Sequence, residues 1–336
     1  MIQGRPGTLL VLLLLATVGL LVLGVAVGST GVAFNWVHQD AEMARQILWQ
    51  IRLPRSLGAW LAGALLGLAG AVAQGLFRNP LADPYLLGSA AGAQLGVALM
   101  LAVFGTSAGI APGSTLGLHS LGLTGAAFVG TVIGVMLALL LARGVEHTLR
   151  LLLAGVVVGV VLNAITNLIM LMVPDIMRAM TAFMLGTTGF LGWHSVSLMA
   201  TTLVLCLLVA LGGSRALDAL SLGEATAQSL GVRLGVVRLA LIAAFALATG
   251  AAVAQAGMIS FVGLVAPHLV RNHCPTTHGR LLVLSACTGG ALLLAADILA
   301  RWAFAPQELP VGLITAVLGG GYLLWLMHRR GGSRRA

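Results

Sequence analysis

Apolar residues fall along this chain in long runs that are separated by short polar stretches. A helix needs about 20 mainly apolar residues to cross a bilayer, and nine runs meet that requirement. A tenth run, at 259–269, is too short to span alone and is expected to be a half-helix packed inside the protein. The nine long runs lie at 8–27, 56–77, 86–104, 122–142, 151–172, 195–212, 237–256, 280–302 and 311–328.

The positions of the arginines decide whether the tenth segment crosses. If it does, thirteen of the 18 basic residues lie on the side of the N-terminus and five on the other side. If it does not, eight lie inside and ten outside. Because cytoplasmic loops carry the excess of positive charge, we predict ten crossings with both termini in the cytoplasm of a bacterial inner membrane.

The composition agrees with a chain that lies in lipid. It is 59% hydrophobic and only 8% charged, with a mean hydropathy of +1.04, whereas globular proteins have about a quarter of their residues charged. There is no room for a large soluble domain, so residues 1–336 are predicted to form one transmembrane domain. The net charge of +9 comes from scattered arginines without any lysine, which indicates topology signals and not nucleic-acid binding.

Small residues recur at four-residue spacing in several runs, as in Gly63/Gly67 and Gly92/Gly96, which lets helix backbones approach closely. We therefore expect a compact helical bundle. The segment 38–52 mixes polar and apolar residues, and it is expected to be either a helix lying on the outer interface or a surface loop.

Several kinds of chemistry are excluded or weakly indicated. A phosphate-binding loop needs a lysine that this chain lacks, so any ATP-driven role requires a separate subunit. No residue spacing indicates a metal site, and no catalytic set emerges. Residues 105–109 match the GxSxG pattern of serine hydrolases without the expected strand-turn-helix context, which leaves an intramembrane hydrolase using Ser107 as an alternative of another class.

A series of motifs spans nearly the whole chain, and their combination is specific. It resembles the permeases of iron-siderophore, haem and cobalamin ABC importers, the FecCD-like type II family. The motifs are Arg52-Leu53-Pro54-Arg55, Arg78-Asn79-Pro80-Leu81-Ala82-Asp83-Pro84, Ser221-Leu222-Gly223-Glu224, Ser229-Leu230-Gly231-Val232, Phe261-Val262-Gly263-Leu264 and Glu308-Leu309-Pro310-Val311-Gly312.

This resemblance implies the type II ABC importer permease fold and an assembly of several proteins. The permease would be a homodimer with two cytoplasmic ABC ATPases and one periplasmic substrate-binding protein. ATP and Mg2+ would bind the ATPases, and this chain would hold no cofactor and catalyse no reaction. The cargo would be a large iron chelate, haem or a ferric siderophore, with cobalamin as the alternative.

The longest cytoplasmic loop is too polar to span, and its segment 217–232 is expected to be a short helix presented to a partner. The resemblance implies that this segment is the coupling helix seated in a cleft of the ATPase. The residues that would transmit ATP-driven closure are Leu222, Gly223, Glu224, Leu230 and Gly231.

Arg52, Arg55 and Arg301 are three of only five arginines expected on the outer side. A cationic outer surface would attract a partner that carries carboxylates. The resemblance implies that these arginines dock the binding protein. Interfacial anchoring, or a pair between Arg301 and Asp297 one turn earlier, is the alternative.

Polar residues at membrane depth are candidates for the translocation path. Asn163, Thr166 and Asn167 give the fifth span a polar face that either lines a path or bonds to another helix. Arg178 and Met184 lie in the outer loop that follows, and they are expected to border the same path. The family usually has a proline-aromatic pair where this chain has Gly321-Tyr322, a departure that bears on which cargo is carried.

Overall fold

The computed structural model describes residues 6–28, 31–32, 41–105, 116–145 and 148–332. Each of the ten predicted apolar segments is a helix, so the predicted all-α architecture is confirmed. These helices are α1 (Pro6–Ala26), α3 (Leu53–Leu76), α4 (Ser89–Phe104), α5 (Leu116–Leu141), α6 (Thr148–Met172), α8 (Trp193–Gly212), α11 (Leu234–Ala256), α12 (Val262–His273), α13 (His278–Trp302) and α14 (Val311–Gly332).

Shorter elements connect the ten helices. The predicted interfacial segment is helical where the structure describes it, as α2 (Ala41–Ile47) followed by the π-helical turn η2 (Leu48–Arg52). A two-residue antiparallel pair joins β1 (Val27–Gly28) to β2 (Gly31–Val32). The remaining elements are the 3-10 turn η4 (Pro174–Ile176), α7 (Met177–Leu185), α9 (Ser214–Ser221) and α10 (Glu224–Ser229).

Seven helices in the described part of the chain are long and apolar enough to cross a membrane. Helix α4 and the stretch Val311–Leu326 of α14 are shorter apolar helices, and α12 has only 12 residues. The short length of α12 agrees with the half-helix expected from the sequence.

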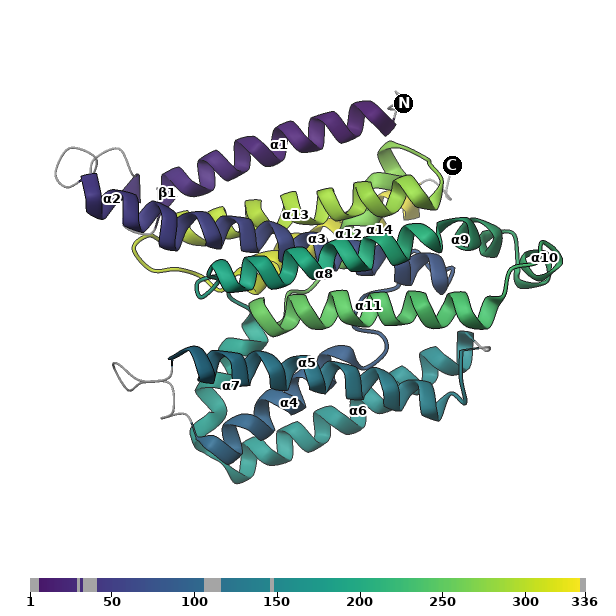
Figure 1. The fold of residues 1–336 in the computed structure, drawn as a ribbon, viewed down its shortest axis with the longest axis horizontal. Helices are drawn as coiled ribbons and strands as arrows, with labels where there is room; N and C mark the ends of the chain where they lie inside the picture. The colour runs from purple at the N-terminus through teal and green to yellow at the C-terminus, as the bar shows by residue number, and fades with distance from the viewer. Residues whose placement is uncertain (1–5, 29–30, 33–40, 106–115, 146–147, 333–336) are drawn as a thin grey trace.

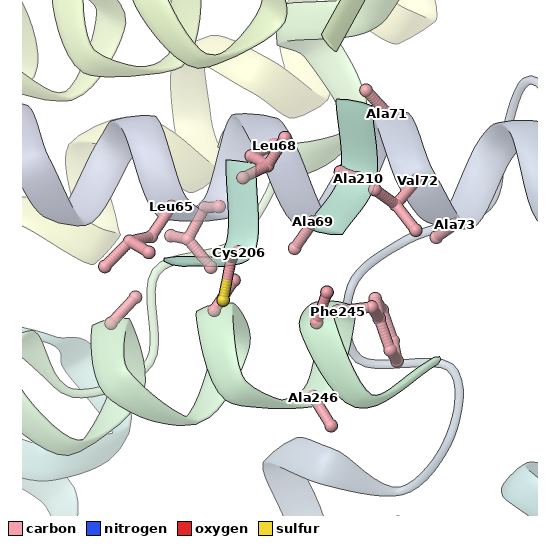
Figure 2. Close-up of a cluster of buried hydrophobic side chains, with 14 of the residues drawn as sticks. Leu65, Leu68, Ala69, Ala71, Val72, Ala73, Cys206, Ala210, Phe245 and Ala246 are labelled. Atoms are coloured by element: carbon pink, nitrogen blue, oxygen red, sulfur yellow. The ribbon is translucent and has the colours of Figure 1, made fainter. Parts of the chain in front are cut away.

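The helices pack around α3, which is enclosed by α13, α11, α12 and α8 (Figure 1). Helices α4, α5 and α6 pack on one another and form a second group beside α11 (Figure 1). The core between α3, α8 and α11 is filled by small, branched and aromatic side chains, among them Cys206, Leu68 and Phe245 (Figure 2).

Small residues permit the closest helix contacts. A Cβ added at Gly63 would lie 2.3 Å from the carbonyl oxygen of Gly289, and one added at Gly92 would lie 2.1 Å from that of Gly130. Side chains larger than a hydrogen would separate α3 from α13 and α4 from α5. The packing role predicted for the spaced glycines is therefore confirmed at these two contacts.

The chain reverses direction between α11 and α12 without leaving the bundle. Gly257, with φ +71°, ends α11, and Phe261, with φ +69°, precedes α12. The peptide groups of Ile259 in this turn have no helical hydrogen bond, and the Tyr85 side chain supplies one for each. The Tyr85 hydroxyl donates to the Ile259 carbonyl oxygen (2.9 Å) and accepts from the Ile259 N–H (3.2 Å). Irregular backbone inside a membrane protein is tolerated only where such partners exist.

The predicted coupling helix at 217–232 is two helices and not one. Gly223 has φ +115°, a conformation that breaks the helix between α9 and α10, and Gly231 at φ +79° ends the segment. We call residues 214–231 the coupling segment. It projects from the end of the bundle at which α1 begins and α14 ends, whereas α2 lies at the opposite end (Figure 1).

Candidate functional site

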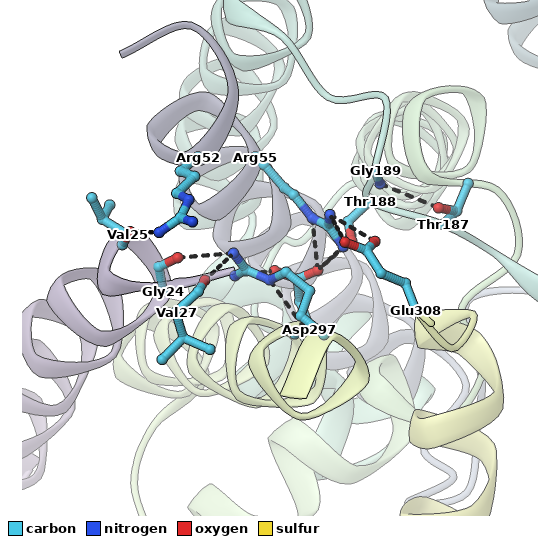
Figure 3. Close-up of polar contacts among 11 residues, drawn as sticks. Gly24, Val25, Val27, Arg52, Arg55, Thr187, Thr188, Gly189, Asp297 and Glu308 are labelled. Carbon is cyan, nitrogen blue, oxygen red and sulfur yellow. Dashed lines mark hydrogen bonds and ion pairs between the residues drawn. The ribbon is translucent and has the colours of Figure 1, made fainter. Parts of the chain in front are cut away.

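The three arginines predicted to dock a partner lie at the α2 end of the bundle, where Arg55 and Arg301 form a buried ion-pair cluster with Asp297 and Glu308 and Arg52 lies beside it (Figure 3). Arg55 donates through Nε and Nη2 to Asp297 Oδ1, both at 3.2 Å, and through Nη1 to Glu308 Oε2 at 2.8 Å. Arg301 Nη2 donates to Asp297 Oδ2 at 2.6 Å. Thr188 Oγ1 donates to the same Asp297 carboxylate, which has no exposed surface.

Two of these arginines also hold the end of α1. Arg301 Nη1 donates to the carbonyl oxygens of Gly24 (2.8 Å) and Val27 (3.1 Å). Arg52 Nη1 donates to those of Val25 (3.2 Å) and Ala26 (3.1 Å). The last carbonyls of a helix have no partner within the helix and carry partial negative charge, so these guanidinium groups stabilise the C-terminus of α1.

The burial of this cluster corrects the predicted cationic outer surface. Arg52, Arg55 and Arg301 are 7%, 9% and 1% exposed, and each donates to oxygens of its own chain. A buried guanidinium is tolerated only when it is paired, which explains why the side chains turn inward. The pair between Arg301 and Asp297, the alternative from the sequence, is confirmed. Direct docking through these arginines stays a prediction.

Thr188 and Glu308 were not recognised from the sequence as members of this cluster. Glu308 lies more than 240 positions from Arg55, and Thr188 lies between α7 and α8. The one available signal was Asp297, because an acidic residue inside an apolar run requires a cation nearby.

The coupling segment at the opposite end presents apolar side chains to solvent. Leu222 and Leu230 are 68% and 64% exposed, and each directly precedes a glycine with positive φ. Glu224 turns back toward the bundle, where its Oε1 accepts from Arg238 Nη2 at 2.6 Å and from Arg78 Nη2 at 3.5 Å. The structure thus brings the five predicted residues together as two exposed leucines, two turn glycines and one anchoring carboxylate.

A second contact ties the coupling segment to the bundle. Asp218 Oδ1 accepts from the backbone N–H of His278 at 2.9 Å and lies 2.7 Å from His278 Nδ1. Asp218 belongs to α9 and His278 opens α13, so this contact joins the segment to the long helix that ends at the buried ion-pair cluster. The coupling segment is therefore attached to α11 through Arg238 and to α13 through His278.

The candidate path residues do not share one face. Asn163 and Asn167 are exposed on α6, and Arg178 and Met184 are exposed on α7. The prediction that Thr166 shares this exposed polar face is corrected. Its side chain is 2% exposed, and its hydroxyl donates to the Leu162 carbonyl oxygen within α6 at 2.9 Å. Ser107 lies outside the described residues.

Comparison with known proteins identifies the family of this chain. Residues 9–329 match the profile of the FecCD transport family. The chain is 39% identical over 328 residues to the hemin transport system permease protein HmuU of Yersinia pestis, covering 96% of this chain and 95% of the relative. It is also 39% identical over 320 residues to the vitamin B12 import system permease protein BtuC of Serratia proteamaculans, covering 94% and 92%.

Solved structures agree with this result. An inward-facing conformation of a metal-chelate type ABC transporter superposes with a TM-score of 0.84 at 28% identity, over 97% of this chain and all of the other. PsaBC from Streptococcus pneumoniae superposes with a TM-score of 0.55 at 14% identity, over 87% of this chain and 93% of the other, which indicates a related fold alone. This chain, a multi-span membrane protein, therefore belongs to the FecCD transport family.

Proposed function

We propose that this chain is the permease of an ATP-driven importer that moves a large iron chelate, haem or a ferric siderophore, from periplasm to cytoplasm by alternating access. The permease works as a homodimer with two cytoplasmic ABC ATPases, which bind ATP and Mg2+, and one periplasmic binding protein. Similarity to a hemin permease and to a metal-chelate type transporter supports this cargo class. Cobalamin is the second candidate, because the similarity to a vitamin B12 permease is equal in identity.

The observation that carries this proposal is the projecting coupling segment. Two leucines that are about two-thirds exposed, Leu222 just before α10 and Leu230 directly after it, present apolar side chains to solvent, and such side chains fit a groove on a partner protein. Its contacts to Arg238 and His278 link it to long helices, so a partner that moves the segment also moves the bundle. We infer that the ATPase holds Leu222 and Leu230 and acts through Glu224.

The orientation follows from the same geometry. The coupling segment lies at the end where α1 begins and α14 ends (Figure 1), and an ATPase is cytoplasmic. Both termini are then cytoplasmic, in agreement with the arginine distribution. The α2 end faces the periplasm.

The binding protein docks at the α2 end in this proposal. Glu308 is the outermost carboxylate of the buried ion-pair cluster, with a side chain 33% exposed, and it pairs with Arg55. A carboxylate of the docked partner would reach Arg55 by displacing Glu308, whereas Arg52 and Arg301 would keep the end of α1 in place. Asn163 and Asn167 on α6, with Arg178 and Met184 on α7, are the exposed groups that we assign to the path between the two permease copies.

ATP hydrolysis and uptake by the complete importer in liposomes test this function. The binding protein would be supplied empty or loaded with haem, ferric siderophore or cobalamin. Stimulation of hydrolysis together with uptake of one chelate is expected, and it would name the cargo. Failure of the ATPase to associate with the permease would refute the proposal. Ser107→Ala is the control for the hydrolase alternative, since loss of activity in this variant would revive it.

A further inference from the structure

A cavity of about 600 Å3 opens between α12, α14 and the loop that follows α3, at the end of the bundle that carries the coupling segment. Its volume lies within the range of about 300–1,000 Å3 that is usual for small-molecule sites. Its lining includes the apolar residues Leu264, Leu323 and Leu326 and the polar residues His268, Arg271 and Asn272. The lining therefore combines apolar walls with one permanent positive charge.

The charge of Arg271 is not neutralised by a carboxylate within the described residues, since none of the ion pairs found there includes it. Its Nη2 donates to the neutral Gln74 Oε1, and Gln74 is itself fixed by donating from Nε2 to the Leu264 carbonyl oxygen at 3.2 Å. Arg271 is partly buried. A partly buried cation with a neutral partner and a cavity in front of it favours the entry of an anion.

The ring of His268 lines the same cavity as this charge, and two further aromatic rings continue from it along α14 outside the cavity lining. The rings of His268 and Tyr322 have centroids 6.0 Å apart, and those of Tyr322 and Trp325 are 6.1 Å apart. His268 belongs to α12, whereas Tyr322 and Trp325 belong to α14. Leu264, His268 and Arg271 follow one another at helical spacing, so one face of α12 carries an apolar group, a ring and a cation in sequence. Rings and leucines accept a flat π-system through its faces and edges.

We propose that this cavity is a cargo subsite on the cytoplasmic half of the path, and that it takes a flat aromatic metal chelate with carboxylate groups, a metalloporphyrin. Arg271 binds a carboxylate through charge-assisted hydrogen bonds, and the lining leucines and the His268 ring hold the macrocycle. The side chains on the corrin ring of cobalamin are neutral amides, and its one anionic group, the phosphodiester of the nucleotide loop, does not lie at the edge of a flat macrocycle as the carboxylates of a porphyrin do. This inference rests on the proposed function, and within that function it favours haem as the cargo.

Binding to the purified permease dimer, in nanodiscs of phosphatidylcholine, tests the subsite without the ATPase or the binding protein. The probes are zinc protoporphyrin and its dimethyl ester, which lacks the carboxylate charges. We expect the free acid to bind the unmodified permease about tenfold more tightly than the ester, as one charge-assisted hydrogen bond implies. Arg271→Gln should remove this preference, and Arg271→Lys should keep part of it.

The matched control is Arg280→Gln, because Arg280 is an exposed arginine near the start of α13, at the same end of the bundle and not among the residues that line the cavity. The control should bind both probes as the unmodified permease does. Equal affinity for acid and ester, or an equal loss in the control, would overturn the inference. Displacement of the porphyrin by added phosphatidylglycerol would also overturn it, because the cavity would then be a lipid headgroup site.

The same preparations separate this inference from the proposed function. ATP-driven uptake of a chelate without any preference for the free acid would overturn the subsite and leave the importer intact. No association with the ATPase, together with no uptake, would refute the importer itself. The comparison of acid with ester on the unmodified permease needs no variant, so it stands even if Arg271→Gln does not fold.

Discussion

Replacement of Asp297, the central carboxylate of the buried ion-pair cluster, should strongly destabilise this bundle. The residue is fully buried and receives hydrogen bonds from Arg55, Arg301 and Thr188, which come from three different parts of the chain. Asp297→Ala leaves two buried guanidinium groups with one remaining carboxylate, that of the partly exposed Glu308. Removing one partner of a buried ion pair costs about 3–5 kcal/mol, because the remaining charge keeps its desolvation penalty.

Two further variants separate charge from shape. Asp297→Asn keeps the size of the side chain and one acceptor oxygen, and it should lose nearly as much stability as Asp297→Ala because the missing quantity is the negative charge. The double variant Asp297→Leu with Arg301→Leu removes one charge of each sign and leaves Arg55 paired with Glu308. It should recover most of the loss, since hydrophobic replacement of a buried pair is often neutral. The remaining deficit, about 1–2 kcal/mol, reflects the α1 carbonyls that lose Arg301.

The assay is the fraction of monodisperse permease that survives heating in detergent, measured at a series of temperatures under one heating protocol, because membrane proteins of this kind unfold irreversibly. The expected order of stability is unmodified permease, then the double variant, then the two single variants. Equal stability of Asp297→Asn and the unmodified permease would refute the argument, since charge neutralisation would then not matter. A double variant no more stable than Asp297→Ala would refute it too.

The remaining predictions concern three other parts of the molecule. Leu222→Ser with Leu230→Ser should weaken binding of the ATPase by at least about tenfold in a pull-down titration, because each leucine buried in an interface contributes about 1.5–3 kcal/mol. The control Gln228→Ala changes an exposed residue of the same segment and should have little effect on binding. Gly70→Ala should destabilise the bundle by about 1–3 kcal/mol in the heating assay, because its Cβ would lie 1.7 Å from the Gly263 carbonyl oxygen, whereas Gly159→Ala, with open space, should be neutral or stabilising. Burial raises the pKa of Asp83, in the loop between α3 and α4, above its ordinary value, so the folded state binds the proton more tightly than the unfolded state. The free energy of unfolding should therefore fall as the pH rises from the ordinary pKa through the raised one. Asp83→Asn should remove this fall, which heating at acidic and at neutral pH would measure.

The ten helices could be predicted from the sequence because crossing a membrane depends on the length and polarity of a single segment, which can be read without knowledge of its neighbours. The direction in which an arginine turns cannot be read in this way. An arginine at the end of a span either extends toward water or turns inward to a carboxylate, and the choice depends on which residues approach it. For Arg55 those residues are Asp297 and Glu308, more than 240 positions away.

Thr166 and Gly223 show two other limits of the sequence. Asn163, Thr166 and Asn167 share one side of a helical wheel, yet Thr166 lies about 100° from Asn167, and the edge between buried and exposed surface runs between them. Only the packing of α6 on its neighbours sets that edge. A single glycine is tolerated inside many helices, so Gly223 by itself does not predict a break within 217–232. Its positive φ in the structure shows that the break is there.

The contacts at the two ends of the bundle suggest which helices stay together during transport. Helix α3 and helix α13 approach at Gly63 and Gly289, where no Cβ could fit, and they are joined at the α2 end by Arg55 and Asp297. Close-packed helices joined by a buried ion pair resist sliding, so we expect α3 and α13 to move as one unit. The coupling segment contacts this unit through His278 and contacts α11 through Arg238. Displacement of the coupling segment would then change the position of α11 relative to the α3–α13 unit. Helix α11 ends at Gly257, beside the Phe183 carbonyl oxygen of α7. The turn at Gly257 would therefore carry the change to α7 and to its exposed residues Arg178 and Met184.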